Sequence, residues 1–150
     1  GNFWISNSLS FDKNLTFLIP FAIILIPLFL GLFYAIGALI SGLFIRENFS
    51  SILYFSSIIS IIDYLRGVIF TGFPWNSWAY SWSWFEEYLQ FVRISGFNIF
   101  NLICITLFCL PVIVFFNNKI KTKISILSLG IFIFFSLFIY GNYSINKKRM

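Results

Sequence analysis

Long apolar stretches separated by short polar segments organise this sequence. Between the charged residues lie uncharged runs that include residues 14–45, 48–62, 94–118 and 124–146. A helix needs about 20 predominantly apolar residues to cross a bilayer, and three of these runs are long enough on their own. The second is long enough if Asp63 and Arg66 lie inside the membrane or at its rim. The pattern therefore predicts an all-α integral membrane protein, with about four transmembrane helices from a larger polytopic bundle.

Turn-forming and charged residues set the limits of these helices. We expect one partial transmembrane domain over residues 1–150, with spans at about 15–45, 49–70, 92–116 and 124–140. The loop at 71–87 is aromatic, and Gly72 and Pro74 direct the chain out of the helix at the membrane surface. The loop at 117–123 is basic. In the first span, small residues recur at helical spacing and predict a face for close helix packing, formed by Gly31, Ala35, Ala38 and Gly42.

Composition supports the membrane assignment. Hydrophobic residues make up 59% of the chain and charged residues 10%, against about 25% charged residues in a typical soluble domain. The net charge of +5 comes from small basic groups at the ends of apolar runs, which indicates membrane topology and anionic lipid rather than nucleic acid. Histidine is absent, so the commonest general base and metal ligand is missing, and we expect no metal or cofactor. Cys104 and Cys109 point about 140° apart on a helix and are expected to be small core residues.

Two features carry candidate chemistry. Asp63 and Arg66 are three residues apart and share one helix face near the rim of the membrane. Such charges face a bundle interior or a watery cavity, so the pair is either a salt bridge that locks helix packing or a site where Arg66 holds a lipid phosphate and Asp63 orients it. Tryptophan is concentrated in the aromatic loop, either as an ordinary interfacial belt or as part of a site, at Trp75, Trp78, Trp82 and Trp84.

The order of residues around this pair resembles a known family. Residues 63–75 read DYLRGVIFTGFPW. The string is similar to the membrane-domain signature of bacterial apolipoprotein N-acyltransferases, in which an acidic residue, an arginine three positions later and TGFPW close one transmembrane helix. Asp63 departs from the glutamate associated with that motif. The similarity extends across nearly all of the chain, through Trp4, the glycine-rich first span, Ala79-Tyr80-Ser81 and Ser95-Gly96.

This resemblance implies an enzyme of the bacterial inner membrane. It transfers an acyl chain from a phospholipid donor to the N-terminal amine of the lipidated cysteine of a lipoprotein, through a thioester on a Glu-Lys-Cys set in a nitrilase-like domain outside the cytoplasm. No residue of this chain matches that set, so we expect a fragment of a longer protein that is inactive alone. The resemblance implies no cofactor. The candidates for substrate or lipid binding are Asp63, Arg66, Thr71, Gly72, Phe73, Pro74, Trp75 and Tyr80.

The charges also bear on topology. One side of the membrane receives Arg46 and the basic loop at 117–123, and the other receives a nearly equal positive count. If the basic C-terminal segment leads into a translocated domain, it loses its topological weight. We therefore expect the basic loop in the cytoplasm, and the tryptophan loop and both ends of the chain on the periplasmic side.

Other functions remain open. A small transporter or channel subunit would use Asp63 and Arg66 to line a polar pathway, although the third and fourth spans carry only scattered polar residues. A membrane scaffold without activity is a further alternative. Glu86 and Glu87 are neighbours that point in different directions, so a solvated edge is expected rather than a general acid pair.

Overall fold

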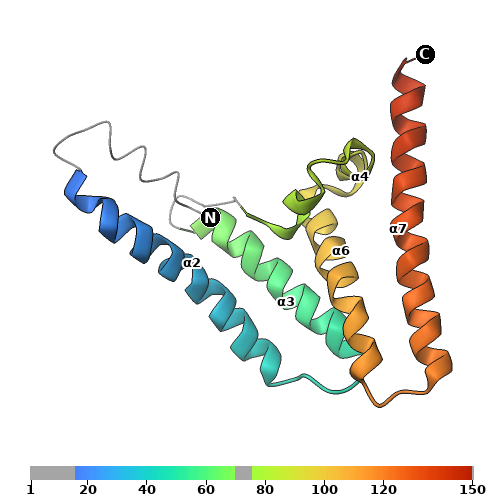
Figure 1. Cartoon of the computed structure of the whole chain (residues 1–150), viewed down its shortest axis with the longest axis horizontal. Helices are drawn as coiled ribbons and strands as arrows, with labels where there is room; N and C mark the ends of the chain where they lie inside the picture. The colour runs from blue at the N-terminus through green and yellow to red at the C-terminus, as the bar shows by residue number, and fades with distance from the viewer. Residues whose placement is uncertain (1–15, 70–75, 150) are drawn as a thin grey trace.

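The computed structural model describes residues 16–69 and 76–149, and only the backbone of 148 and 149. Within these ranges the chain is helical and contains no strand. Four helices are long and apolar enough to cross a membrane, at Thr16–Gly42, Phe49–Val68, Phe97–Phe115 and Ile120–Lys147 (Figure 1). The predicted fold class, all-helical with four long apolar helices, is confirmed.

The first two long helices pack against each other. A short 3-10 turn, η1 (Thr16–Leu18), leads into α2 (Ile19–Gly42), and α3 (Phe49–Val68) follows after a polar turn. The Asn48 side chain caps α3 by accepting a hydrogen bond from the Ser51 amide at 2.9 Å. At the contact, a Cβ on Gly37 would lie 3.0 Å from the Ile62 side chain, so glycine is what permits this approach.

The packing face of α2 differs from the predicted one. Gly31, Ala35 and Ala38 are exposed, and nothing described lies within 4 Å of a Cβ placed on Gly31. The buried residues of α2 are Leu30, Gly37 and Ser41, on the face that also carries Tyr34. Small residues allow close helix packing but do not by themselves determine which face packs. The hydrogen bond from Tyr34 to Asp63 turns the Tyr34 face of α2 toward α3 instead.

The third span is interrupted at its start. In place of one helix over 92–116, the structure has α5 (Val92–Ser95), a break at Gly96, α6 (Phe97–Cys109) and a 3-10 turn η4 (Leu110–Phe115). Gly96 has φ 77°, a left-handed conformation that glycine adopts without steric cost. Pro111 lies in the first turn of η4, where its missing N–H ends the regular α-helical hydrogen bonding. The apolar span proper therefore begins at Phe97.

The last helix is longer than the span expected at 124–140. Helix α7 (Ile120–Arg149) begins inside the segment expected to be a loop, because lysine is a good helix former and its side chain can cap neighbouring carbonyls. Lys123 Nζ donates to the Val114 carbonyl at 2.8 Å. The Asn117 amide donates to Glu47 Oε2 at 3.2 Å, so the turns before α3 and before α7 lie together at one end of the molecule (Figure 1).

The aromatic segment lies at the opposite end. There η3 (Trp78–Trp82) packs on α6, and α4 (Glu86–Leu89) packs on the C-terminal half of α7 (Figure 1). The Tyr88 ring lies 5.1 Å from the ring of Phe134 and 5.9 Å from that of Phe138. A buried cluster joins these elements, formed by Ala79, Tyr88, Phe100, Cys104 and Leu137. The described part of the loop, from residue 76 onward, is therefore packed against the long helices.

Candidate functional site

Asp63 is the centre of a buried polar cluster. Its Oδ1 accepts a hydrogen bond from the Tyr34 hydroxyl at 2.5 Å and lies 3.2 Å from Arg66 Nη2. Its Oδ2 accepts a hydrogen bond from Asn101 Nδ2 at 2.8 Å. Only 5% of Asp63 is exposed. Because these donors come from α2, α3 and α6, one carboxylate joins three membrane helices.

Arg66 has its charge compensated inside the same cluster. Only 3% of the residue is exposed, and its Cζ lies 5.3 Å from the centre of the Tyr34 ring, within cation–π range. Nη2 also donates to Ser77 Oγ at 3.5 Å, a long contact that reaches the aromatic loop just before η3. Arg66 Nε is buried and has no hydrogen-bond partner within the described part of the chain. The ion pair makes the cluster neutral overall, which lowers the cost of burying both charges.

Asn101 completes the cluster on the side of η3. Its Oδ1 accepts a hydrogen bond from the Ala79 backbone amide at 2.8 Å, while its Nδ2 donates to Asp63. Asn101 is 2% exposed. Neither Asn101 nor Tyr34 was among the residues predicted from sequence. The sequence does carry a signal for Asn101, because a side-chain amide within an apolar span needs a partner inside the protein.

A polar cavity adjoins the cluster. Its volume is about 280 Å³, and it lies between the C-terminal end of α3, the N-terminal end of α6 and the segment before η3. Asp63 and Ser77 contribute polar groups to its wall. The full lining comprises Asp63, Tyr64, Gly67, Val68, Ser77, Phe97, Asn98 and Asn101. The polar part of the cavity wall therefore lies beside the buried charged groups.

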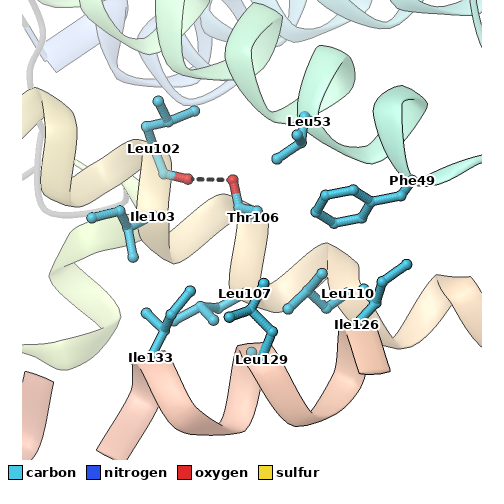
Figure 2. Close-up of a pocket in the computed structure, with 11 residues that line it drawn as sticks. Phe49, Leu53, Leu102, Ile103, Thr106, Leu107, Leu110, Ile126, Leu129 and Ile133 are labelled. Atoms are coloured by element: carbon cyan, nitrogen blue, oxygen red, sulfur yellow. Dashed lines mark hydrogen bonds between the residues drawn. The ribbon is translucent and has the colours of Figure 1, made fainter. Parts of the chain in front are cut away.

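A second recess has no such chemistry. It measures about 320 Å³ between α3, α6 and α7, and aliphatic side chains and Phe49 dominate its wall (Figure 2). Its one hydroxyl, on Thr106, donates to the Leu102 carbonyl of its own helix at 2.8 Å. The lining therefore offers almost no polar group to a ligand.

The predicted site residues fall into three groups. Asp63 and Arg66 lie together in the cluster. Tyr80 lies outside it, 44% exposed, with its ring 5.1 Å from that of Phe97. The remaining predicted residues lie outside the described ranges, namely Thr71, Gly72, Phe73, Pro74 and Trp75.

The tryptophans and cysteines of the described segments lie outside the polar cluster, and those that are buried pack against other side chains. Trp82 stacks on Phe108 at 5.8 Å between ring centres, whereas Trp84 is 89% exposed. Cys104 is buried and Cys109 is half-buried, and both are free thiols. Among the described residues, no group of three or more His, Cys, Asp or Glu side chains could hold a metal ion.

Comparison with known proteins identifies the family. The model of the apolipoprotein N-acyltransferase N-terminal domain matches residues 1–110. The chain belongs to the apolipoprotein N-acyltransferase family. The matched range contains the whole polar cluster and ends before α7.

Named relatives agree with this family. An apolipoprotein N-acyltransferase of Brucella melitensis is 30% identical over 127 residues, which are 84% of this chain and 24% of the relative. Those of Sinorhizobium medicae and Rhizobium rhizogenes are 26% and 24% identical, over 84% and 100% of this chain and 24% and 28% of their own lengths. The chain therefore spans about a quarter of the length of these relatives. No solved structure matches it.

Proposed function

We propose that the complete protein transfers an acyl chain from a phospholipid to the N-terminal amine of the lipidated cysteine of lipoproteins, and that this chain supplies part of its membrane domain. The observation that carries the proposal is the family match over residues 1–110. The polar cluster supports it, because buried ionisable groups within membrane helices are costly and are commonly retained for function. This chain contributes no catalytic residue to the proposed reaction.

The substrate cavity is proposed to lie at the end of the bundle that carries the aromatic loop. The 280 Å³ polar cavity and the half-exposed ring of Tyr80 support this location. Over this end, the loop would bring further aromatic and turn residues to the acyl donor and acceptor. These are Thr71, Gly72, Phe73, Pro74 and Trp75.

For Asp63 and Arg66 we favour a role in holding the helices and the loop in place. The Arg66 guanidinium already lies against a carboxylate and an aromatic ring, so a buried phosphate would bring a negative charge without a free positive partner. The competing role, in which Arg66 binds a lipid phosphate, has one supporting observation in the unpartnered Nε. A phospholipid and a diacylglycerol with the same acyl chains, each offered as donor to the unsubstituted protein, distinguish these roles. If Arg66 binds the donor phosphate, the KM is higher for the donor without phosphate, and if Arg66 only holds the helices and the loop, the two KM values are similar.

We further propose that the basic turns face the cytoplasm and the aromatic segment faces the periplasm, across the bacterial inner membrane. Support comes from the contact between Asn117 and Glu47, which brings both turns to one end. That end therefore carries Arg46, Lys119, Lys121 and Lys123. A concentration of Arg and Lys in short loops marks the cytoplasmic side.

Acyl transfer by the complete gene product tests this function directly. The protein is reconstituted in vesicles of acyl-labelled phospholipid with a diacylated lipopeptide whose N-terminal amine is free. We expect label to appear on that amine, and we expect Arg66→Gln to abolish the transfer because it leaves Asp63 buried without its charge partner. Arg46→Gln is the matched control, since Arg46 is exposed at the opposite end, and it should retain the activity. Absence of transfer by the unsubstituted protein would refute the proposal and favour a scaffold or transport role.

A further inference from the structure

We propose that Asn101 is a positioning residue for acyl transfer. It holds η3, which is part of the aromatic loop, against α6 and, through Asp63, against α2 and α3. This inference rests on the proposed function for its effect on catalysis. The contact itself is a separate claim, because the hydrogen bond to the Ala79 amide is measurable without any substrate.

Both ends of the Asn101 amide are used, and in one orientation only. Nδ2 faces the Asp63 carboxylate, which can only accept, and Oδ1 faces the Ala79 backbone N–H, which can only donate. Rotating the amide by 180° would place two donors against each other at Ala79. Since Asn101 is 2% exposed and Ala79 is 1% exposed, water does not readily replace either contact.

The contacts form a relay across four elements. The Tyr34 hydroxyl of α2 donates to Asp63 of α3, Asp63 accepts from Asn101 of α6, and Asn101 accepts from Ala79 of η3. Residues that are 29, 38 and 22 positions apart in sequence are joined in this way. The relay therefore makes the position of η3 depend on the orientation of one buried amide.

A second tie reaches the same segment from Arg66, whose Nη2 donates to Ser77 Oγ. Ser77 and Ala79 precede Tyr80, the exposed aromatic residue that we place beside the substrate cavity. The two ties thus act on the end of the aromatic loop. Loss of the tie from Asn101 frees the Ala79 amide and lets Tyr80 move relative to α6.

A reciprocal exchange of side chains tests the relay. In Asp63→Asn, the new amide must offer its oxygen to Arg66 and its nitrogen to Asn101. The Asn101 amide then has to rotate by 180°, so that its nitrogen, a donor, faces the Ala79 backbone N–H, which is also a donor. In Asn101→Asp, two carboxylates face each other. The double variant Asp63→Asn/Asn101→Asp restores the donor–acceptor pairs that link positions 63, 101 and 79, because position 63 now donates to position 101 and position 101 still accepts from Ala79. The net charge is unchanged, but the carboxylate no longer lies at position 63, where it paired with Arg66.

Hydrogen–deuterium exchange at the Ala79 amide and the kcat/KM of acyl transfer are measured for the complete gene product in lipid nanodiscs. We expect each single variant to raise the exchange rate and to lower kcat/KM by about tenfold or more. The double variant should restore the exchange rate within about threefold and kcat/KM only in part, because Arg66 has lost its adjacent carboxylate. Asn142→Asp is the control, because it adds the same charge to an exposed residue of α7 outside the relay.

Three results are decisive. Unchanged Ala79 exchange in both single variants, or Ala79 exchange in the double variant as fast as in the single ones, overturns the relay. Restored exchange with kcat/KM no higher than in the single variants overturns its role in the reaction. If the unsubstituted protein transfers no acyl chain, the proposed function fails, and the exchange rates alone decide whether Asn101 positions η3.

Discussion

Replacing Gly141 with alanine should separate α4 from α7. Gly141 lies against the backbone of Glu87, and a Cβ there would overlap the Glu87 carbonyl group and lie 2.7 Å from its Cα. The obstructing atoms belong to the backbone, so no side-chain rotation relieves the overlap. In Gly141→Ala, α4 must therefore move away from α7.

The size of the effect follows from opposing contributions. Alanine is favoured over glycine in a helix interior by about 1 kcal/mol. Overpacking costs about 1–3 kcal/mol, and each aromatic pair that is lost costs about 1 kcal/mol more. The pairs at risk join Tyr88 to Phe134 and to Phe138, with ring centres 5.1 and 5.9 Å apart. We therefore expect Gly141→Ala to lower the free energy of unfolding by about 2 kcal/mol.

Thermal unfolding in detergent measures this change, with a thiol-reactive dye that reports exposure of the buried Cys104. We expect Gly141→Ala to lower Tm by about 5 °C. Gly31→Ala is the matched control, because nothing described lies within 4 Å of its Cβ and only the helix propensity changes. Its Tm should be unchanged or higher. Equal Tm values for the two variants would refute the close contact between α4 and α7.

Three further predictions concern pH, topology and the thiols. Burial, and to a lesser extent the Glu87 carboxylate, raise the pKa of Tyr88 above 10. The neutral form of Tyr88 therefore stabilises the fold, and this stability is lost as the pH rises from 10 through the raised pKa. In this pH range, Tm should fall less steeply for Tyr88→Phe than for the unsubstituted protein. With other reactive cysteines replaced, an impermeant maleimide should label Ser83→Cys in intact spheroplasts, and Lys121→Cys only after lysis; the reverse would invert the proposed orientation. Replacing both Cys104 and Cys109 with alanine should preserve the acyl transfer proposed for the complete protein, and its loss without a fall in Tm would show that a thiol of this chain takes part.

Much of the architecture was predictable from local sequence. Whether a segment crosses a membrane depends on the summed hydropathy of about 20 consecutive residues, and that sum does not require knowledge of any contact. The family signature is likewise a continuous string, and the i, i+3 spacing places Asp63 and Arg66 on one helix face. These features were predicted and are present, whereas the loop residues 71–75 stay a prediction.

The tertiary structure decided which helix faces meet and which polar groups pair. Between helices in lipid the hydrophobic effect does not select a face, because lipid tails solvate an apolar side chain as well as another helix does. The small-residue pattern at Gly31 therefore did not identify the packing face, which follows Gly37 and the hydrogen bond from Tyr34 to Asp63. In the sequence, Asn101 is one of several scattered polar residues. Only the orientation of α6 about its axis in the structure shows that Asn101 faces Asp63. Hydropathy along the chain is enough to predict membrane helices, whereas a few buried hydrogen bonds between distant residues set how these helices are turned toward one another.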